Sequence, residues 1–138
     1  MLLLHQNTPG GSYYFHWMRD GALTMRSVQE TSSFAEYEET LKAYSLWVLN
    51  AQAQSDPHNQ DVRTEPKFNL PDGGVFSGEW CRPQNDGPGL RATALMMFAD
   101  TMLAKNNTDF VSENLWTGDG GKNGRLCIIF KKKNLILS

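Results

Sequence analysis

The chain is poor in the features that mark metal, redox and membrane proteins. Its two cysteines and three histidines do not fall at metal-ligand spacings, which predicts no zinc site and allows at most one internal disulfide. No apolar run reaches the length of a membrane span, and the apolar start at residues 1–4 is too short for the core of a signal peptide. We therefore expect no metal, no cofactor and no membrane partner, and the sequence leaves the localisation open.

An excess of charge of one sign is also missing. The 13 lysines and arginines are balanced by 15 aspartates and glutamates, so the net charge is −2. Such a chain lacks the basic field that dominates nucleic-acid binding, and we expect no nucleic-acid partner. With 40% hydrophobic and 20% charged residues, the composition is instead typical of a single globular domain.

Hydrophobic periodicity predicts about three helices and no regular strand. The strongest pattern covers residues 34–53, where apolar side chains recur at three- and four-residue steps after a capping-box pair, Ser33 and Glu36. A weaker pattern covers residues 17–30. A further helix is expected to begin near residue 86, where an acid and an early proline suit a helix start, and to continue through residue 102.

A long stretch without helical period separates the second and third predicted helices. Residues 55–86 contain four of the six prolines, which predicts an irregular loop. Irregular loops of this length inside a compact domain are usually functional or mobile. We therefore expect functional residues in and around this loop.

Aromatic and charged residues gather in three blocks. Residues 13–20 read Tyr-Tyr-Phe-His-Trp-Met-Arg-Asp, residues 65–69 read Glu-Pro-Lys-Phe-Asn, and residues 78–92 read GEWCRPQNDGPGLRA. Flat apolar faces beside hydrogen-bonding groups suit ligands that have apolar faces and a polar rim, and sugars are such ligands. Each block also has a structural explanation, since Arg19 and Asp20 could form a surface ion pair, Trp80 could be a core residue, and Lys67 could lie in a solvated loop.

Taken in order, the three blocks resemble the first half of the catalytic domain of eukaryotic glucoamylases, the family 15 glycoside hydrolases. That family carries similar Tyr-Phe-x-x-Trp-x-Arg-Asp, Glu-Pro-Lys-Phe-Asn and Gly-x-Trp-x-Arg-Pro-Gln segments. The resemblance implies that Arg19 and Asp20 bind the terminal non-reducing glucose. It also implies that Trp80 lies over the substrate, with Arg82 in a supporting polar role. Lys67 and Asn69 would face the sugar. Asp86, Gly87 and Arg91 also match the family, and we assign them to helix start and packing.

The resemblance implies an all-α fold, as part of an (α/α)6 barrel. Residues 12–118 would form the N-terminal part of a glucoamylase-like catalytic domain. Residues 119–138 change in character, with a Gly-rich stretch and three lysines, and are interpreted as an atypical tail that arises from truncation or from a gene-model artefact.

The implied activity is the inverting release of glucose from the non-reducing ends of starch- or glycogen-like α-glucans, with an α-glucan or maltooligosaccharide as partner. Glycoside hydrolysis needs two carboxyl groups, and the segments that carry them in glucoamylases have no counterpart in this chain. We therefore assign no catalytic residue and expect the chain to be inactive alone, so its status as an enzyme is open.

Two other functions remain open at this point. A trehalase or glucodextranase fragment would share the barrel and the acid–base chemistry, and a non-catalytic carbohydrate-binding module would explain aromatic and arginine residues without catalytic acids. The family is often secreted or vacuolar and lysosomal. A glycosylation sequon, Asn106-Asn107-Thr108, would be usable only in a secreted chain.

Overall fold

The computed structural model describes residues 13–58, 61–78 and 84–115. This part of the chain is mostly helical, and in chain order its elements are β1 (Phe15–Trp17), α1 (Met18–Thr31), α2 (Phe34–Gln52), the 3-10 turn η1 (Val62–Thr64), β2 (Lys67–Asn69), α3 (Asp86–Ala104), the short α4 (Thr108–Phe110) and the π-turn η2 (Val111–Leu115). The predicted all-α class is confirmed, together with three long helices whose ends lie within two residues of expectation. Trp80, Arg82 and the predicted tail at 119–138 lie outside the described residues.

The helix boundaries follow from local chemistry. At the start of α2, the carboxylate of Glu36 accepts hydrogen bonds from the backbone N–H and the hydroxyl of Ser33, each at 2.8 Å, as the capping-box pattern predicts. On the outer face of the same helix, Lys42 pairs with Glu38 at 2.7 Å. These contacts fix where α2 begins and keep its polar face toward water.

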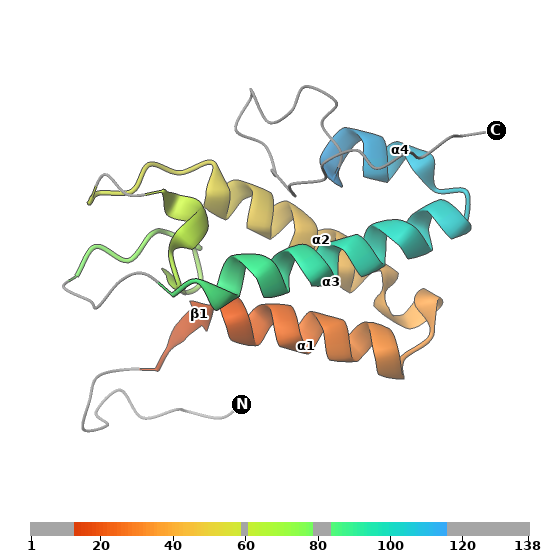
Figure 1. Cartoon of the computed structure of the whole chain (residues 1–138), viewed down its shortest axis with the longest axis horizontal. Helices are drawn as coiled ribbons and strands as arrows, with labels where there is room; N and C mark the ends of the chain where they lie inside the picture. Colours follow the sequence, from red (N-terminus) through yellow and green to blue (C-terminus); the bar gives the residue numbers. More distant parts are fainter. Residues whose placement is uncertain (1–12, 59–60, 79–83, 116–138) are drawn as a thin grey trace.

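The main core lies between α2 and α3. α1 and α3 run side by side along the molecule, and α2 crosses behind them (Figure 1). The facing sides of α2 and α3 supply most of the buried apolar side chains, and the 111–115 segment closes them off at one end. The members of this cluster are Tyr37, Leu41, Tyr44, Val48, Leu95, Phe98, Met102, Val111 and Leu115.

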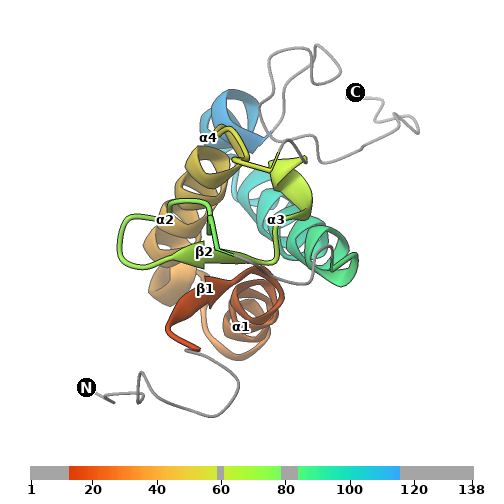
Figure 2. The same ribbon diagram turned by 90° about the vertical axis from the view of Figure 1, so that its left-hand side faces the viewer.

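A second, smaller core lies where the loop returns to the helices. Met18, Ala51, Val62 and Phe68 are buried together, and Trp47 packs against Phe68 with ring centroids 5.6 Å apart. This cluster holds the loop segment 62–68 against the ends of α1 and α2. Figure 2 looks onto this end of the molecule, with the two strands in front of the helices.

The predicted irregular loop contains more structure than expected. β2 pairs antiparallel with β1, and the register places Phe15 opposite Asn69, His16 opposite Phe68, and Trp17 opposite Lys67. The backbone N–H of Met18 extends the pairing by donating to the carbonyl of Pro66 at 2.9 Å. The strands therefore bring together two of the three blocks that the sequence singled out.

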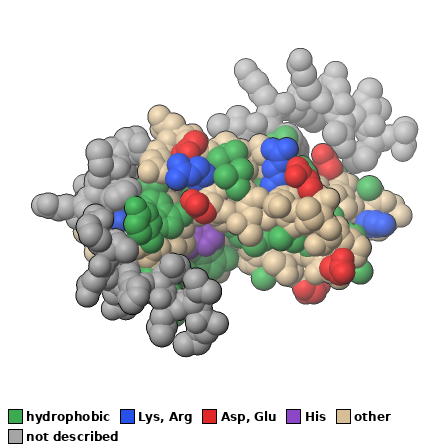
Figure 3. All heavy atoms as spheres, turned by 90° about the horizontal axis from the view of Figure 1, so that it is seen from below, with side chains coloured by type: hydrophobic (Ala, Val, Ile, Leu, Met, Phe, Trp, Pro, Cys, Tyr) green, Lys and Arg blue, Asp and Glu red, His purple; other side chains and the backbone are tan. Residues whose placement is uncertain are grey.

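None of the helices in the described ranges combines the length and the apolar character that crossing a bilayer requires. Figure 3 shows lysines, arginines, aspartates and glutamates interspersed with hydrophobic side chains on one face, so that face has no continuous field of one sign.

Candidate functional site

The two strands and the start of α1 form the framework of the candidate site. β1 leads directly into α1, so Arg19 and Asp20 stand on the first turn of that helix, immediately after the strand. β2 carries Lys67 and Asn69 on the neighbouring strand. Four of the six predicted substrate-binding residues therefore come from two segments that are far apart in sequence and paired in space.

Lys67 lies among aromatic rings. Its ammonium nitrogen is 4.0 Å from the centroid of Phe76, 4.3 Å from that of Phe15 and 5.4 Å from that of Trp17. The residue is only 5% exposed. Cation–π attraction strengthens when the charge is removed from water, so these rings stabilise a lysine that would otherwise be costly to bury.

Asn69 organises the turn that follows β2. Its side-chain amide donates to the carbonyl of Val75 at 3.3 Å, and its backbone carbonyl accepts from the N–H of Gly73 at 2.9 Å. Gly73 has a φ of 73°, and a side chain at this position would come within 2.9 Å of the Trp47 indole nitrogen. The turn therefore requires glycine both for its backbone conformation and for the space beside Trp47.

Arg19 lies between two carboxylates. Its guanidinium nitrogen Nη1 donates to Asp86 at 3.0 Å, and its Nε is 3.7 Å from Asp20. The hydrogen bond from Arg19 lowers the pKa of Asp86 below its ordinary value. Asp20 is more open, with 67% of its side chain exposed. Its carboxylate can therefore accept hydrogen bonds from a ligand in solvent.

The sequence predicts Asp86 only as part of a helix start, whereas in the structure it contacts Arg19 at the candidate site. It opens α3 and is 67 residues away from Arg19 in the chain. The signal that could have found it was its match to the family within the same block as Trp80. Nothing in a single sequence, however, pairs one acid with one distant arginine.

His16, on β1, contacts Trp47 with the ring centroids 4.0 Å apart and the ring planes tilted by 43°. A side chain at Gly21 would approach the imidazole to 2.7 Å, so the first turns of α1 need glycine there. Burial lowers the pKa of His16, and the nearby Asp20 opposes the shift. The contact with Trp47 and the closeness of Gly21 favour a packing role for His16.

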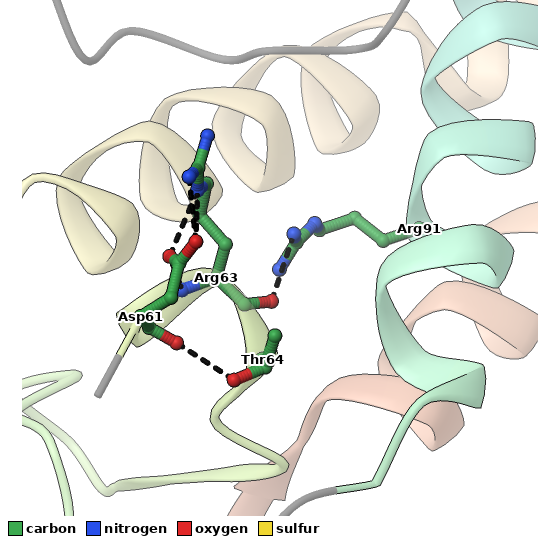
Figure 4. Close-up of polar contacts among 4 residues, drawn as sticks. All are labelled: Asp61, Arg63, Thr64 and Arg91. Carbon is green, nitrogen blue, oxygen red and sulfur yellow. Dashed lines mark hydrogen bonds and ion pairs between the residues drawn. The ribbon is translucent and has the colours of Figure 1, made fainter.

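Arg91 anchors the segment that leads into β2. It projects from α3, is 5% exposed, and donates from Nη2 to the backbone carbonyl of Arg63 at 3.2 Å. Within the turn, Asp61 accepts a forked pair of hydrogen bonds from the Arg63 guanidinium, and its carbonyl accepts from the Thr64 hydroxyl at 2.8 Å (Figure 4). α3 thus holds the turn before β2 with Arg91, and it holds Arg19 with Asp86.

All three sequence blocks meet at this end of the molecule. The first and second are joined by the β1–β2 pairing, and the first and third by the Arg19–Asp86 bond. Phe76, just before the undescribed residues 79–83, packs on Phe15 with centroids 5.1 Å apart. The chain therefore contacts the site on both sides of the segment that carries Trp80 and Arg82, whose positions remain a prediction.

The described residues contain no cluster of histidine, cysteine, aspartate or glutamate that could hold a metal ion. The arrangement that is present consists of aromatic faces, a paired guanidinium, an exposed carboxylate and an amide. Such a combination can bind a polyhydroxylated ligand through hydrogen bonds and apolar stacking.

Comparison with known proteins shows the family to which the chain belongs. Residues 5–117 match the family described as glycosyl hydrolases family 15. The chain belongs to this family. It is 39% identical over 113 residues to a glucoamylase of Blastobotrys adeninivorans, an alignment that covers 78% of this chain and 18% of the relative. It is 40% identical over 104 residues to glucoamylase 1 of Rhizopus oryzae, covering 72% of this chain and 17% of the relative.

A more distant relative is the probable glucoamylase of Schizosaccharomyces pombe. It is 30% identical over 122 residues, which cover 83% of this chain and 26% of that protein. The alignments with these three relatives thus span between 17% and 26% of their length. No solved structure gave a significant match. Family 15 membership confirms the resemblance carried by the three blocks.

Proposed function

We propose that this chain forms part of the glucose-binding wall of a family 15 domain that releases glucose from the non-reducing ends of starch- or glycogen-like α-glucans. Its similarity to proteins named glucoamylases supports this function over a trehalase or glucodextranase. The single observation that carries the proposal is the meeting of the three blocks around Arg19, through the strand pairing and the bond to Asp86.

Arg19 and Asp20 are the pair that would grip the sugar. The guanidinium has five N–H donors in a fixed plane, and the bond to Asp86 at 3.0 Å orients that plane. The exposed Asp20 carboxylate supplies acceptors beside it. A donor and an acceptor side by side match vicinal hydroxyl groups, so a ligand that carries such hydroxyls can hydrogen-bond to both side chains.

The described carboxylates near Arg19 suit binding better than proton transfer. A general acid needs a raised pKa, so that it still holds its proton at working pH. Arg19 lowers the pKa of Asp86, which keeps that group ionised. Asp86 is therefore a positioning residue for Arg19, and the proposal assigns the hydrolytic acid and base to neither Asp86 nor Asp20.

The test is a titration of the 138-residue chain with maltose, followed by tryptophan fluorescence and calorimetry. We expect Asp20→Asn and Arg19→Lys each to weaken binding about tenfold or more, because asparagine removes the carboxylate charge and lysine removes the planar fork of donors. The matched control is Arg26→Ala, which breaks the ion pair with Glu30 on the same helix, at an arginine of similar exposure. Binding by the parent chain that is unchanged in Asp20→Asn would contradict the proposal, as would the absence of maltose binding by a chain with native helical content.

Trehalose serves as the comparison ligand. It offers the same glucose unit with a different linkage, so a site built for α-1,4 glucans should bind maltose more tightly. A preference for trehalose would instead favour the trehalase alternative.

A further inference from the structure

The turn between α3 and α4 places two adjacent asparagines in different environments. Asn106 is exposed and has a φ of 60°, and no other non-glycine residue in the described ranges has positive φ. Its N–H donates to the carbonyl of Leu103, and the N–H of Asn107 donates to that of Met102, each at 2.9 Å. This is the Schellman pattern that closes a helix, with Asn106 at the left-handed position.

Asn107 is tied into the fold through its side chain. It is half-buried, and its amide nitrogen lies 3.4 Å from the Glu38 carboxylate on α2. Asn106 has no side-chain hydrogen bond to the other described residues. Its amide projects from the turn into solvent, where an enzyme can reach it.

The left-handed backbone at position 106 suits glycine or asparagine, so the residue type is compatible with the helix end. The helix end uses only the backbone of Asn106, and the exposed side-chain amide is available for another role. Asn106, Asn107 and Thr108 form the pattern Asn-x-Thr, with a residue other than proline at the centre. This acceptor pattern occurs only once in the chain.

We propose that Asn106 is an N-glycosylation site. The side-chain nitrogen Nδ2 would attack the first sugar of a lipid diphosphate-linked oligosaccharide. A carbon–nitrogen bond forms, the sugar–phosphate bond breaks, the amide loses one proton, and the lipid diphosphate leaves with the bonding electrons. Thr108, which is exposed, completes the acceptor sequence, and its hydroxyl donates to the carboxylate of the adjacent Asp109 at 3.3 Å.

The position separates the glycan from the sugar-binding end. α3 has 19 residues and is about 28 Å long, with Asp86 at its start and Asn106 just beyond its end. Figure 1 shows the α3–α4 turn at the opposite end of the molecule from β1. A glycan at Asn106 would lie beside Leu103, which is 38% exposed, and would leave the neighbourhood of Arg19 open.

The experiment directs the full chain, behind a cleavable secretion signal, into a eukaryotic secretory host. Intact mass before and after peptide-N-glycosidase treatment measures the modification, and peptide mapping locates it, because the enzyme converts a glycosylated asparagine to aspartate. We expect an enzyme-sensitive glycan at Asn106 that is lost in Asn106→Gln and in Thr108→Ala. It should be retained in Thr108→Ser and in Asn107→Gln, which both preserve the acceptor pattern.

An internal reporter makes a negative result decisive. The substitution Arg125→Thr creates a second acceptor sequence at Asn123. Only chains that have lost the signal peptide are scored, since these have entered the secretory compartment. Asn106 left unmodified in that population would overturn the proposal, and a glycan on Asn123 in the same chains would show that the transferase had reached them.

Discussion

Two buried polar groups lower the stability of the core beside the candidate site. Tyr44 and Arg91 face each other between α2 and α3, and both are almost fully buried. Among the described residues, neither the Tyr44 hydroxyl nor the Nη1 of Arg91 has a hydrogen-bond partner. An unmet buried hydroxyl costs about 1–3 kcal/mol, so this part of the core is less stable than its apolar packing alone would make it.

We expect the free energy of unfolding to fall at alkaline pH because of the buried phenol of Tyr44. Burial raises its pKa from 10.0 to about 12, although the nearby Arg91 opposes the shift. The unfolded chain releases this proton near pH 10 and the folded chain holds it until about pH 12. The free energy of unfolding is therefore unaffected by this titration below pH 10 and falls between pH 10 and 12, by at most roughly 2–3 kcal/mol.

Thermal or urea unfolding followed by circular dichroism from pH 8 to 12 measures this effect. Tyr44→Phe should flatten the alkaline decline, and it should not destabilise the chain at neutral pH because the hydroxyl it removes is unsatisfied. Tyr13→Phe, at an exposed tyrosine, is the control and should leave the curve unchanged. An alkaline decline of equal size in Tyr44→Phe would show that another group causes it.

The sequence identified candidate residues better than their partners. Arg19 and Asp20 stood out because an arginine and an acid follow an aromatic run, and that signal is local. The contact between Arg19 and Asp86 spans 67 residues, and the contact between Arg91 and Arg63 spans 28. Such contacts depend on how α3 lies against α1 and the loop, which no local pattern records.

Among the secondary-structure elements, α3 has the largest effect on the site. Its first turn supplies Asp86 to Arg19, and its second turn supplies Arg91 to the carbonyl before β2. A single rigid helix therefore sets the separation between the Arg19 side and the Lys67 side. Residues on a helix hold such a spacing more closely than residues on loops.

Arg91→Ala should loosen β2 more than it unfolds the helices. The substitution leaves the Arg63 carbonyl without its buried donor, at a cost of about 1–3 kcal/mol to the local structure. Amide hydrogen exchange in β1 and β2 should then become roughly 5- to 150-fold faster, while the central amides of α2 stay protected.

Arg91→Lys keeps one donor and the charge, and should give an intermediate rate. Arg26→Ala serves again as the exposed arginine control. Exchange in the two strands that is as slow in Arg91→Ala as in the parent chain would show that the turn at 61–64 is held by its own hydrogen bonds alone.

The long elements were predictable and the short ones were not. Periodic apolar positions over many residues located α1, α2 and α3. β1 and β2 have three residues each, too few to display an alternating pattern. α4 and η2 are similarly short, and α4 follows the Schellman turn at Asn106, which the sequence signals only through an asparagine.

At the scale of the whole molecule, large apolar side chains reach the surface at several places. In the described ranges these are Tyr13, Tyr14, Leu23, Leu46, Leu70 and Leu103. Because the alignments with the relatives cover only 17% to 26% of their length, further parts of such proteins have no counterpart here. Exposed apolar surface favours association, and we expect the chain to be prone to it.

We predict that the 138-residue chain releases no glucose from starch or maltose above background. Hydrolysis requires a protonated and an ionised carboxyl on opposite sides of the bond. The described carboxylates beside Arg19 are Asp86, whose pKa is lowered by Arg19, and Asp20, to which the proposal gives a binding role. A coupled glucose assay on purified chain checks this, and glucose release that disappears in Asp20→Ala would contradict it.

The pairing of β1 with β2 also has a consequence for synthesis. Fifty residues separate Trp17 from its partner Lys67, so at 5–20 residues per second the first strand emerges from the ribosome roughly 3–10 s before the second. During that interval the aromatic side chains of the newborn segment have no sheet to join. The two-stranded framework of the candidate site is thus assembled late, after the first two helices have been translated. Slow elongation through codons 18–67 would prolong the exposure of the first strand to aggregation.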